Sequence, residues 1–450
     1  MASSVKNMTG GTPGKLILLF AVPLMLGNVF QQLYTMVDTM IVGQVVGVNA
    51  LAAVGAADWL VWLVFGIVTG MTQGFSILIS QFYGAERWED LKKTIAVSYM
   101  LTAVIAVLVV LVSQITVYQV LVFLNTPEEV LPISMKYIRI IFSGIPIVAA
   151  YNVLAAILRA LGNSKTPLIA MIVAAIVNIV LDILFVAQFH WGVAGAAIAT
   201  LIAQAVSALY CYMVLRKIEV IHLEKSHFSM DWTVSGKLIK LGTPLAFQNI
   251  IISVGGLVVQ SVVNGFGVLF VAGFTATNKM YGILESAAIS YGYAITTYVG
   301  QNLGAGLYGR IKKGVRQGAL MAIVTSLVIS VAMIIFGKGI LSLFISGTPE
   351  ETEMVMKIAY QYLFIMACML WVLYLLYVYR SALQGLGNTV VPLASGIAEF
   401  FMRVGAALVL PLFIGSNGIF YAEISAWTGA AVLLMVSYYV IIKKYKEGKA

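Results

Sequence analysis

The sequence predicts an all-α integral membrane protein with twelve transmembrane helices. Of its 450 residues, 61% are hydrophobic and only 10% are charged, whereas a soluble domain carries about 25% charged residues. Apolar runs of about 20 residues or more, the length that a helix needs to cross a bilayer, recur along the whole chain. Lipid rather than water is therefore expected to cover most of the surface.

Twelve apolar runs are long enough to be spans. They lie at residues 16–40, 50–81, 94–123, 134–158, 168–188, 193–215, 238–262, 269–300, 317–343, 355–383, 391–413 and 418–442. The first run lacks a small-residue cleavage site, so we expect it to stay in the membrane rather than to act as a signal peptide. Pro23 and Gly27 in the first run, and Pro146 in the fourth, are expected to bend their helices.

The distribution of Lys and Arg predicts the orientation, because basic loops are retained in the cytoplasm. Successive polar segments alternate between the two sides of the membrane. The segments on one side, counted together with Arg380, hold 21 of the 27 basic residues, and those on the other side hold 4. Lys279 and Arg403 lie within spans. Both termini are therefore expected in the cytoplasm. The basic residues are spread over short loops, so the net charge of +9 does not indicate a nucleic-acid partner.

The chain also repeats itself, which indicates two similar halves. Three segments recur at offsets of 220 to 225 residues: "AVPLMLGN" at 21–28 with "GTPLAFQN" at 242–249, "ISQFYGAERWEDLKK" at 79–93 with "VGQNLGAGLYGRIKK" at 299–313, and "LRALGNSKTPL" at 158–168 with "LQGLGNTVVPL" at 383–393. Each half holds six spans, so a pseudo-twofold along the membrane normal is expected. We predict an N-terminal lobe at 1–216, a cytoplasmic linker at 217–236 and a C-terminal lobe at 237–450.

These segments, together with "DTMIVG" at 38–43, resemble the multidrug and toxic compound extrusion (MATE) family of antiporters, and the likeness covers essentially the whole chain. The resemblance implies a V-shaped pair of six-helix lobes in a bacterial inner (plasma) membrane. It implies the export of organic cations and amphipathic drugs in exchange for protons or sodium. No enzymatic activity and no cofactor are expected, and the protein is expected to be a monomer.

Two carboxylates lie at comparable depth in the N-terminal half. Asp38 ends the first span, and Asp182 lies in the fifth. An ionised carboxylate in a bilayer is costly unless it faces the bundle interior, water or a partner, so the two acids indicate a shared pocket. Asn178 lies one helical turn before Asp182, and Thr200 on the sixth span offers a hydroxyl. The alternative for Asp38 is a helix-end residue near the extracellular surface.

The resemblance to the DinF-like branch of the family implies a cation-coupling network formed by Asp38, Asn178, Asp182 and Thr200. Two close carboxylates in a medium of low dielectric constant suit a proton carrier. We therefore expect proton coupling first, and a sodium ion at Asp38 and Asp182 second. The other branch of the family places acids on helices seven and ten, and the corresponding spans of this chain contain none.

The C-terminal half nevertheless carries intramembrane charges. Lys279 and Glu285 lie on the eighth span, and Glu399 and Arg403 on the eleventh. The spacing of Glu399 and Arg403 is that of an intrahelical ion pair at i, i+4, which would be structural. Glu285 lies near the middle of a span rich in Ser, Thr, Tyr and Gly, and it is a candidate for attracting a cationic substrate.

The remaining substrate-binding candidates lie on spans one and four. Tyr34, Met36 and Tyr151 offer aromatic or soft surfaces for flat cations, while Gln31 and Asn152 carry amides that need partners in lipid. The nearest alternative function is a lipid-linked oligosaccharide flippase of the wider superfamily, which would need a more cationic cavity. A membrane-embedded enzyme or receptor is the alternative from another class, and it would need a catalytic or metal constellation that the loops do not offer.

Overall fold

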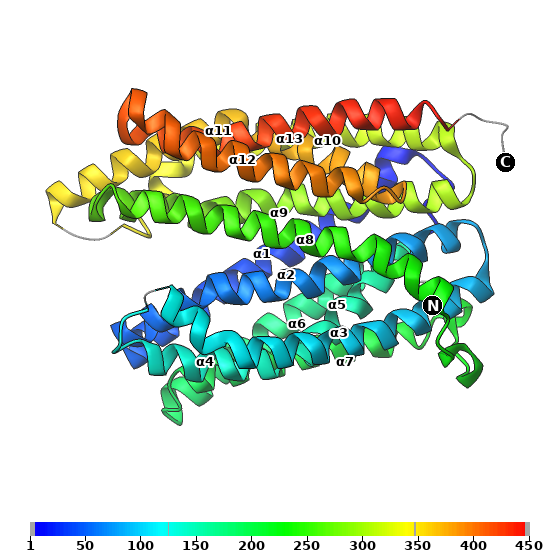
Figure 1. The fold of residues 1–450 in the computed structure, drawn as a ribbon, viewed down its shortest axis with the longest axis horizontal. Helices are drawn as coiled ribbons and strands as arrows, with labels where there is room; N and C mark the ends of the chain where they lie inside the picture. Colours follow the sequence, from blue (N-terminus) through cyan, green and yellow to red (C-terminus); the bar gives the residue numbers. More distant parts are fainter. Residues whose placement is uncertain (1–4, 125, 346–347, 446–450) are drawn as a thin grey trace. The chain divides into compact units, whose positions relative to one another are not determined.

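The computed structural model describes residues 5–124, 126–345 and 348–445, and within these ranges the chain is helical with no strand. Figure 1 shows long helices running back and forth. Their bounds are α1 Pro13–Ile41, α2 Val48–Gly84, α3 Trp88–Phe123, α4 Leu131–Ser143, α5 Ile145–Ala160, α6 Lys165–Asp182, α7 Val193–Leu215, α8 Trp232–Asn264, α9 Val268–Gly304, α10 Tyr308–Leu341, α11 Pro349–Gly385, α12 Val390–Ile414 and α13 Phe420–Ile442. Short π-helical or 3₁₀ segments η1 (Val42–Val46), η2 (Ile183–Gln188), η3 (Glu219–Ile221), η4 (Lys225–Phe228) and η5 (Gly415–Ile419) connect some of them.

The predicted twelve-span fold is confirmed. Within the described ranges, nine stretches are long and apolar enough to cross a membrane, or ten if the bent pair α4–α5 is one span. One of these stretches, Val390–Ile442, holds both α12 and α13, which pack side by side on either side of η5. The twelfth span is α9, whose hydropathy is lower because it carries polar residues together with Lys279 and Glu285.

The expected bend in the fourth span is present. The axes of α4 and α5 differ by 46° at a break formed by Gly144. Pro146 follows at the start of α5, where its missing N–H and fixed φ are tolerated because a first-turn N–H has no intrahelical partner. A Cβ at Gly144 would lie 2.0 Å from a methyl group of Leu201 on α7, so any larger residue at the break would displace that side chain.

The chain forms two compact units. The first contains the residues up to Met8 and Val22–Ile250, and the second contains Thr9–Ala21 and the residues from Ile251 onward. Two helices therefore contribute to both units: the start of α1 belongs to the second unit and the start of α8 to the first. The lobe and linker boundaries expected from the sequence stay a prediction.

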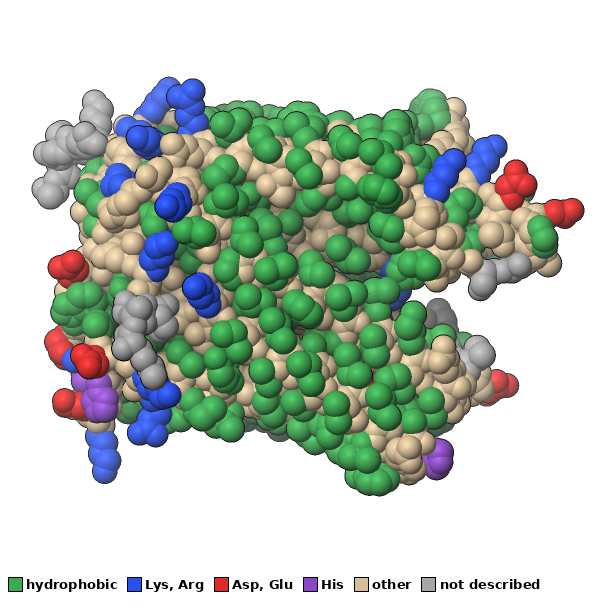
Figure 2. Space-filling view, turned by 180° about the vertical axis from the view of Figure 1, so that it is seen from behind, with side chains coloured by type: hydrophobic (Ala, Val, Ile, Leu, Met, Phe, Trp, Pro, Cys, Tyr) green, Lys and Arg blue, Asp and Glu red, His purple; other side chains and the backbone are tan. Residues whose placement is uncertain are grey.

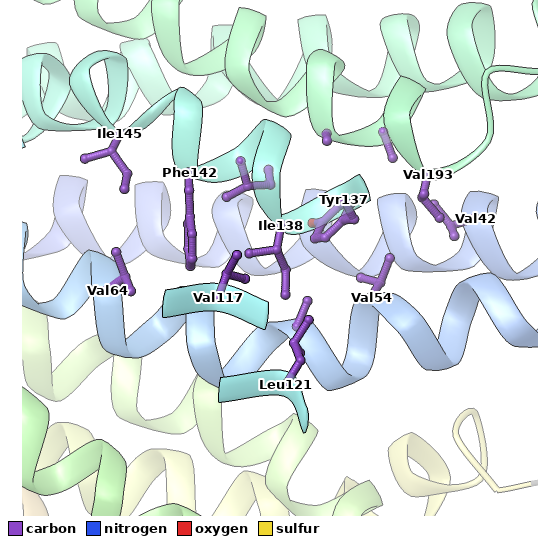
Figure 3. Packing of buried hydrophobic residues seen from close by; sticks show 14 of the residues in the cluster. Val42, Val54, Val64, Val117, Leu121, Tyr137, Ile138, Phe142, Ile145 and Val193 are labelled. Carbon is purple, nitrogen blue, oxygen red and sulfur yellow. The ribbon is translucent and has the colours of Figure 1, made fainter. Parts of the chain in front are cut away.

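A layer of buried apolar side chains holds the first unit together. Figure 3 shows residues of this layer from α2, α3, α4 and α5, with Val42 of η1 and Val193 at the start of α7 at one end. Among them, Ile138, Ile145 and Leu121 have no exposed surface. In the second unit, α11 is the central helix and packs against α9, α10 and α13.

Helices α2 and α8 approach each other backbone to backbone within the first unit. A Cβ on Gly74 would lie 2.3 Å from the Cα of Gly242, and a Cβ on Gly70 would lie 2.5 Å from the backbone nitrogen of Ala246. One turn further along, the side-chain amide of Asn249 donates to the carbonyl oxygen of Gly66 over 2.9 Å. Small residues spaced four apart allow this close packing in a membrane, where dispersion contacts replace the hydrophobic effect.

Gly74→Ala is expected to destabilise the protein by about 1–3 kcal/mol, because the added methyl group has no space and must push α2 and α8 apart. Gly55→Ala on the same helix is the matched control, since no atom lies within 4 Å of its Cβ position. That control should stabilise the helix by about 0.5–1 kcal/mol. Thermal unfolding in detergent measures both variants. Equal effects of the two substitutions would contradict the close contact.

The internal repeat is visible in the backbone. Left-handed φ angles recur in the two halves at Gly47 (110°) and Gly267 (91°), Gly162 (85°) and Gly387 (80°), Gly192 (59°) and Gly415 (67°), and Glu86 (55°) and Gly306 (70°). The side chains of Asn163 and Asn388 accept hydrogen bonds from the backbone N–H three residues later, at 3.0 and 3.1 Å. Both halves therefore use the same turns before α6 and α12.

The surface agrees with a membrane location. On the face drawn in Figure 2, hydrophobic side chains cover the middle lengths of the helices, and the charged side chains gather at the helix ends. The segment before α8 is held to the start of α3 by His227, whose Nε2 lies 3.2 Å from a carboxylate oxygen of Glu89, and by a 3.4 Å ion pair between Asp231 and Lys93. Hydrogen bonds from the backbone N–H of Val234 and Thr233, with the Lys93 ammonium, hold the pKa of Asp231 below its usual value.

Candidate functional site

Asp38 and Asp182 come together inside the first unit. Asp38 lies in the last turn of α1 and is 8% exposed, and Asp182 is the last residue of α6 and has no exposed surface. Their carboxyl groups lie close enough to interact electrostatically. Two ionised carboxylates cannot hydrogen-bond to each other, because ionised oxygens only accept. The pair therefore has a place for one bridging proton or one cation.

Both aspartates lie directly before a change in helix type. α1 continues as the π-helical segment η1 four residues after Asp38, and α6 continues as η2 immediately after Asp182. The two π-helical segments contact each other. π-Helical turns are rare and occur frequently at functional sites, since the extra residue per turn changes which backbone groups are paired. The acids therefore lie at or just before the change from α-helix to π-helix in both helices.

Several buried oxygen atoms at this site have no hydrogen-bond partner among the described residues. They are Oδ1 of Asp38, both carboxylate oxygens of Asp182 and Oδ1 of Asn178. Buried polar atoms are normally paired, because an unpaired group loses its hydration without compensation. Four such acceptors in one region form a site that lacks a donor or a positive charge.

Asn178 and Thr200 extend the site onto α7. The side-chain nitrogen of Asn178 lies 3.5 Å from the hydroxyl of Thr200, at the outer limit of a hydrogen bond. Asn178 has no exposed surface and Thr200 is half-buried. The four residues predicted as a coupling network thus lie on α1, α6 and α7 of one unit. Their oxygens are hard donors of the kind that a proton or an alkali cation takes.

Tyr137 and Asp58 also belong to this neighbourhood, and neither was among the predicted site residues. The buried phenol of Tyr137, on α4, lies near Asp38, Asp58 and Asp182. Figure 3 shows its ring in the same layer as Val42 and Val193. Asp58, an exposed residue of α2, lies close enough to Asp38 to interact electrostatically. The only available signal for Tyr137 was a tyrosine on the buried side of a short amphipathic helix.

The substrate-binding candidates of the first unit occupy different environments. Tyr34 is buried close to the side chains of Gln31 and Gln204 and to Asp38, and Met36 is half-buried on the same helix. The half-buried Tyr151 packs against the apolar cluster around Leu154 and Ile157.

Asn152 is also half-buried, and its side-chain nitrogen donates to the carbonyl oxygen of Val148 over 2.9 Å. That bond lies within its own helix. Tyr34 therefore lies near Asp38 with Gln31 beside it, whereas the amide nitrogen of Asn152 is already used.

Glu285 lies in the second unit, on α9. One of its carboxylate oxygens accepts hydrogen bonds from the hydroxyl groups of Tyr281 at 3.0 Å and Tyr377 at 2.8 Å. None of the ion pairs formed by the described residues includes Glu285. Lys279 on the same helix has an exposed side chain. Glu285 is thus a half-buried carboxylate whose hydrogen-bond donors are neutral.

The ion pairs of the second unit differ from the expected intrahelical pair, and that prediction is wrong. Glu399 pairs with Arg380 of α11, and Arg403 pairs with Glu423 of α13 over 2.9 Å. Arg380 was expected in a cytoplasmic loop, but it lies within α11 and is 6% exposed. The i, i+4 rule applies to residues of one helix, whereas these guanidinium groups reach carboxylates on neighbouring helices.

Comparisons with known proteins agree on one family. The MatE family model matches residues 23–184 and 244–409. "Probable multidrug resistance protein YoeA" of Bacillus subtilis is 30% identical over 95% of this chain and 94% of its own. "Probable multidrug resistance protein YpnP" of the same organism is 30% identical over 76% of each chain.

Solved structures agree with the fold. A structure described as an outward-facing conformation of a multidrug resistance MATE family transporter of the MOP superfamily superimposes with a TM-score of 0.90, covering 99% of both chains at 22% identity. The family model covers most of the chain in two stretches that follow its internal repeat. The protein is therefore a multi-pass membrane protein that belongs to the MATE family of transporters.

Proposed function

We propose that this protein is a secondary active multidrug efflux transporter that exports cationic or amphipathic organic molecules in exchange for protons. Membership of the family and the names of its relatives support drug efflux. The observation that supports proton coupling is the buried Asp38–Asp182 pair, which has unpartnered oxygens and no cationic side chain among the ion pairs of the described residues. A carboxyl pair of this kind can carry a proton and release it when it meets water.

In this mechanism, a proton bridges Asp38 and Asp182 and neutralises the pair. When the proton leaves, two like charges remain in a region of low dielectric constant, and their repulsion favours separation of α1 from α6. The π-helical segments η1 and η2 give both helices a place to adjust. Protonation thereby changes the position of Gln31 and Tyr34, which lie on the same helix as Asp38, and so couples the proton to the drug.

Sodium is the second candidate ion. The observation that favours it is Oδ1 of Asn178, a buried oxygen without a partner among the described residues. This atom could complete an oxygen shell with Asp38, Asp182 and Thr200, and an alkali cation prefers oxygen ligands. A proton needs only the two carboxylates, whereas a sodium ion needs all four side chains. The role of Asn178 therefore distinguishes the two ions.

For the substrate, the proposal assigns Gln31, Tyr34, Met36, Tyr151 and Asn152 in the first unit and Glu285 in the second. Aromatic rings and the Met36 thioether offer polarizable surfaces to flat cations. Glu285 supplies a carboxylate whose hydrogen-bond partners are neutral tyrosine hydroxyls. The protein is proposed to act as a monomer in the bacterial inner (plasma) membrane with both termini in the cytoplasm.

Efflux from proteoliposomes tests the coupling ion. The purified full-length protein is reconstituted with a fluorescent cationic dye, and either a pH gradient or a sodium gradient is imposed. We expect dye transport under the pH gradient alone, with no requirement for sodium. Transport that follows only the sodium gradient, and that Asn178→Ala abolishes, would establish the sodium alternative. Dye movement under neither gradient would contradict the proposed function.

Asp182→Asn is expected to shift the pH dependence of efflux toward acid. Asp38 then lacks the neighbouring charge that opposed its ionisation, so it releases its proton at lower pH. The efflux rate is measured against internal pH and normalised to the protein in the membrane. If Asp182 only supports helix packing, the rate should fall evenly at every pH, and a profile parallel to that of the unsubstituted protein would contradict the shared site.

A further inference from the structure

The second unit contains a basic cavity that the transport proposal does not use. It has a volume of about 340 Å³ and lies between the start of α10 and the end of α13. Its polar lining consists of Lys312, Arg316 and Lys443 together with Tyr438 and Tyr439. All three cationic side chains are exposed, and none of the ion pairs formed by the described residues includes them. The cavity therefore presents three uncompensated positive charges.

The walls of the cavity are built from packed aromatic rings. Tyr438 is 2% exposed, and its hydroxyl has no hydrogen-bond partner among the described residues. Its ring lies 5.5 Å from that of Tyr379 on α11, and the hydroxyl of Tyr379 lies 3.2 Å from that of Tyr439. Tyr308 and Tyr445, with ring centroids 5.5 Å apart, join the beginning of α10 to the residues after α13. The cavity is thus a built feature of the fold.

The position of the cavity indicates which anion it takes. Basic residues gather at this end of the helices, which the positive-inside rule assigns to the cytoplasmic side. Directly beyond the cavity, the outer faces of both helices become apolar. Leu320 and Val324 on α10 are 63% and 53% exposed, and Val436 and Val440 on α13 are each 56% exposed. A ligand here would meet charge at the headgroup level and an apolar surface at the depth of acyl chains.

We infer that this cavity binds the phosphate headgroup of an anionic phospholipid, whose acyl chains lie along the apolar faces of α10 and α13. Lys312, Arg316 and Lys443 supply the charge, because basic pockets between transmembrane helices attract anionic headgroups. Tyr438 and Tyr439 form the aromatic part of the wall beside the headgroup. The site lies in the second unit and is independent of the coupling residues Asp38 and Asp182.

Lipid titration of the full-length protein in neutral detergent tests the inference. Native mass spectrometry counts bound dioctanoylphosphatidylglycerol, with dioctanoylphosphatidylcholine as the neutral-headgroup arm and inorganic phosphate as the arm without acyl chains. We expect one molecule of phosphatidylglycerol to bind more tightly than any further molecule of the same lipid. Neither comparison ligand should compete with it at equal concentration. Equal binding of inorganic phosphate would show an anion site without lipid specificity and would overturn the inference.

The variant Lys312→Gln/Arg316→Gln/Lys443→Gln should weaken phosphatidylglycerol binding roughly 100-fold, since each basic residue near a headgroup contributes about fivefold. Lys237→Gln/Lys313→Gln/Lys444→Gln is the matched control, because it removes the same charge from exposed residues outside the cavity. Equal losses in the two triple variants would overturn the site, because net charge alone would then explain the binding.

Discussion

Asp38→Asn is expected to abolish proton-driven efflux while the protein stays folded in the membrane. Asparagine has nearly the shape of a protonated aspartic acid, so the buried position is still filled and the neighbouring Tyr34 and Asp182 keep their surroundings. The variant cannot release a proton, however, and is held in the protonated form. Dye efflux from proteoliposomes under a pH gradient should fall to the rate of protein-free vesicles at every pH.

Asp90→Asn is the control for this experiment. Asp90 lies in the first turn of α3 and pairs with Arg87 over 2.7 Å at the surface, and an exposed ion pair contributes little. This substitution removes a carboxylate of the same type and should leave efflux and its pH dependence unchanged. Normal proton-driven efflux by Asp38→Asn, with the variant present in the membrane at the usual level, would defeat the assignment of Asp38.

The second large effect is expected from the buried pair of Arg380 and Glu399. Glu399→Gln leaves the buried guanidinium of Arg380 without its counterion, and breaking a buried pair in this way costs about 3–5 kcal/mol. The double variant Arg380→Met/Glu399→Gln should recover much of this loss, because no lone charge remains. The measurement is the thermal stability of the purified variants in detergent, arranged as a double-mutant cycle.

A parallel cycle tests the choice of partner. Glu399→Gln combined with Arg403→Met should show weaker coupling than the Arg380 cycle, since Arg403 pairs with Glu423. Strong coupling of Glu399 to Arg403 and none to Arg380 would reverse the assignment and restore the intrahelical pair. Additive losses in both cycles would mean that neither guanidinium depends on Glu399.

The sequence predicts the helical membrane fold well because the length of an apolar run is a property of the bilayer rather than of long-range contacts. The bend before Pro146 and the turns at Asn163 and Asn388 were also accessible, since proline and glycine constrain the backbone locally. The hydropathy of α9 is too low for a strict apolar-length criterion, but its apolar run at 269–300 still predicted a span there. Most of the fold could therefore be predicted from apolar runs and from local backbone constraints.

The candidate site was only partly accessible. Asp38 and Asp182 stand out because a carboxylate in an apolar run needs a reason, and the structure brings them together. Tyr137 contacts this region from α4, and no sequence spacing connects it to α1 or α6. Arg380 was likewise assigned to a loop. Its carboxylate partner lies 19 residues further along the chain on another helix, so no local spacing indicated the pair. Partners across helices depend on packing, which a single sequence does not encode locally.

The sharing of α1 and α8 between the units limits how this protein can be divided. Cutting the chain in the segment 217–231 would leave the first fragment without the part of α8 that contributes Gly242 and Ala246 to its packing against α2. The second fragment would in turn lack Thr9–Ala21, whose Gly14 N–H donates to Gln317 on α10 over 2.8 Å. Neither half is thus a self-sufficient module. A chimera that exchanges whole halves between two such transporters would have to keep the start of α8 with the first unit and Thr9–Ala21 with the second.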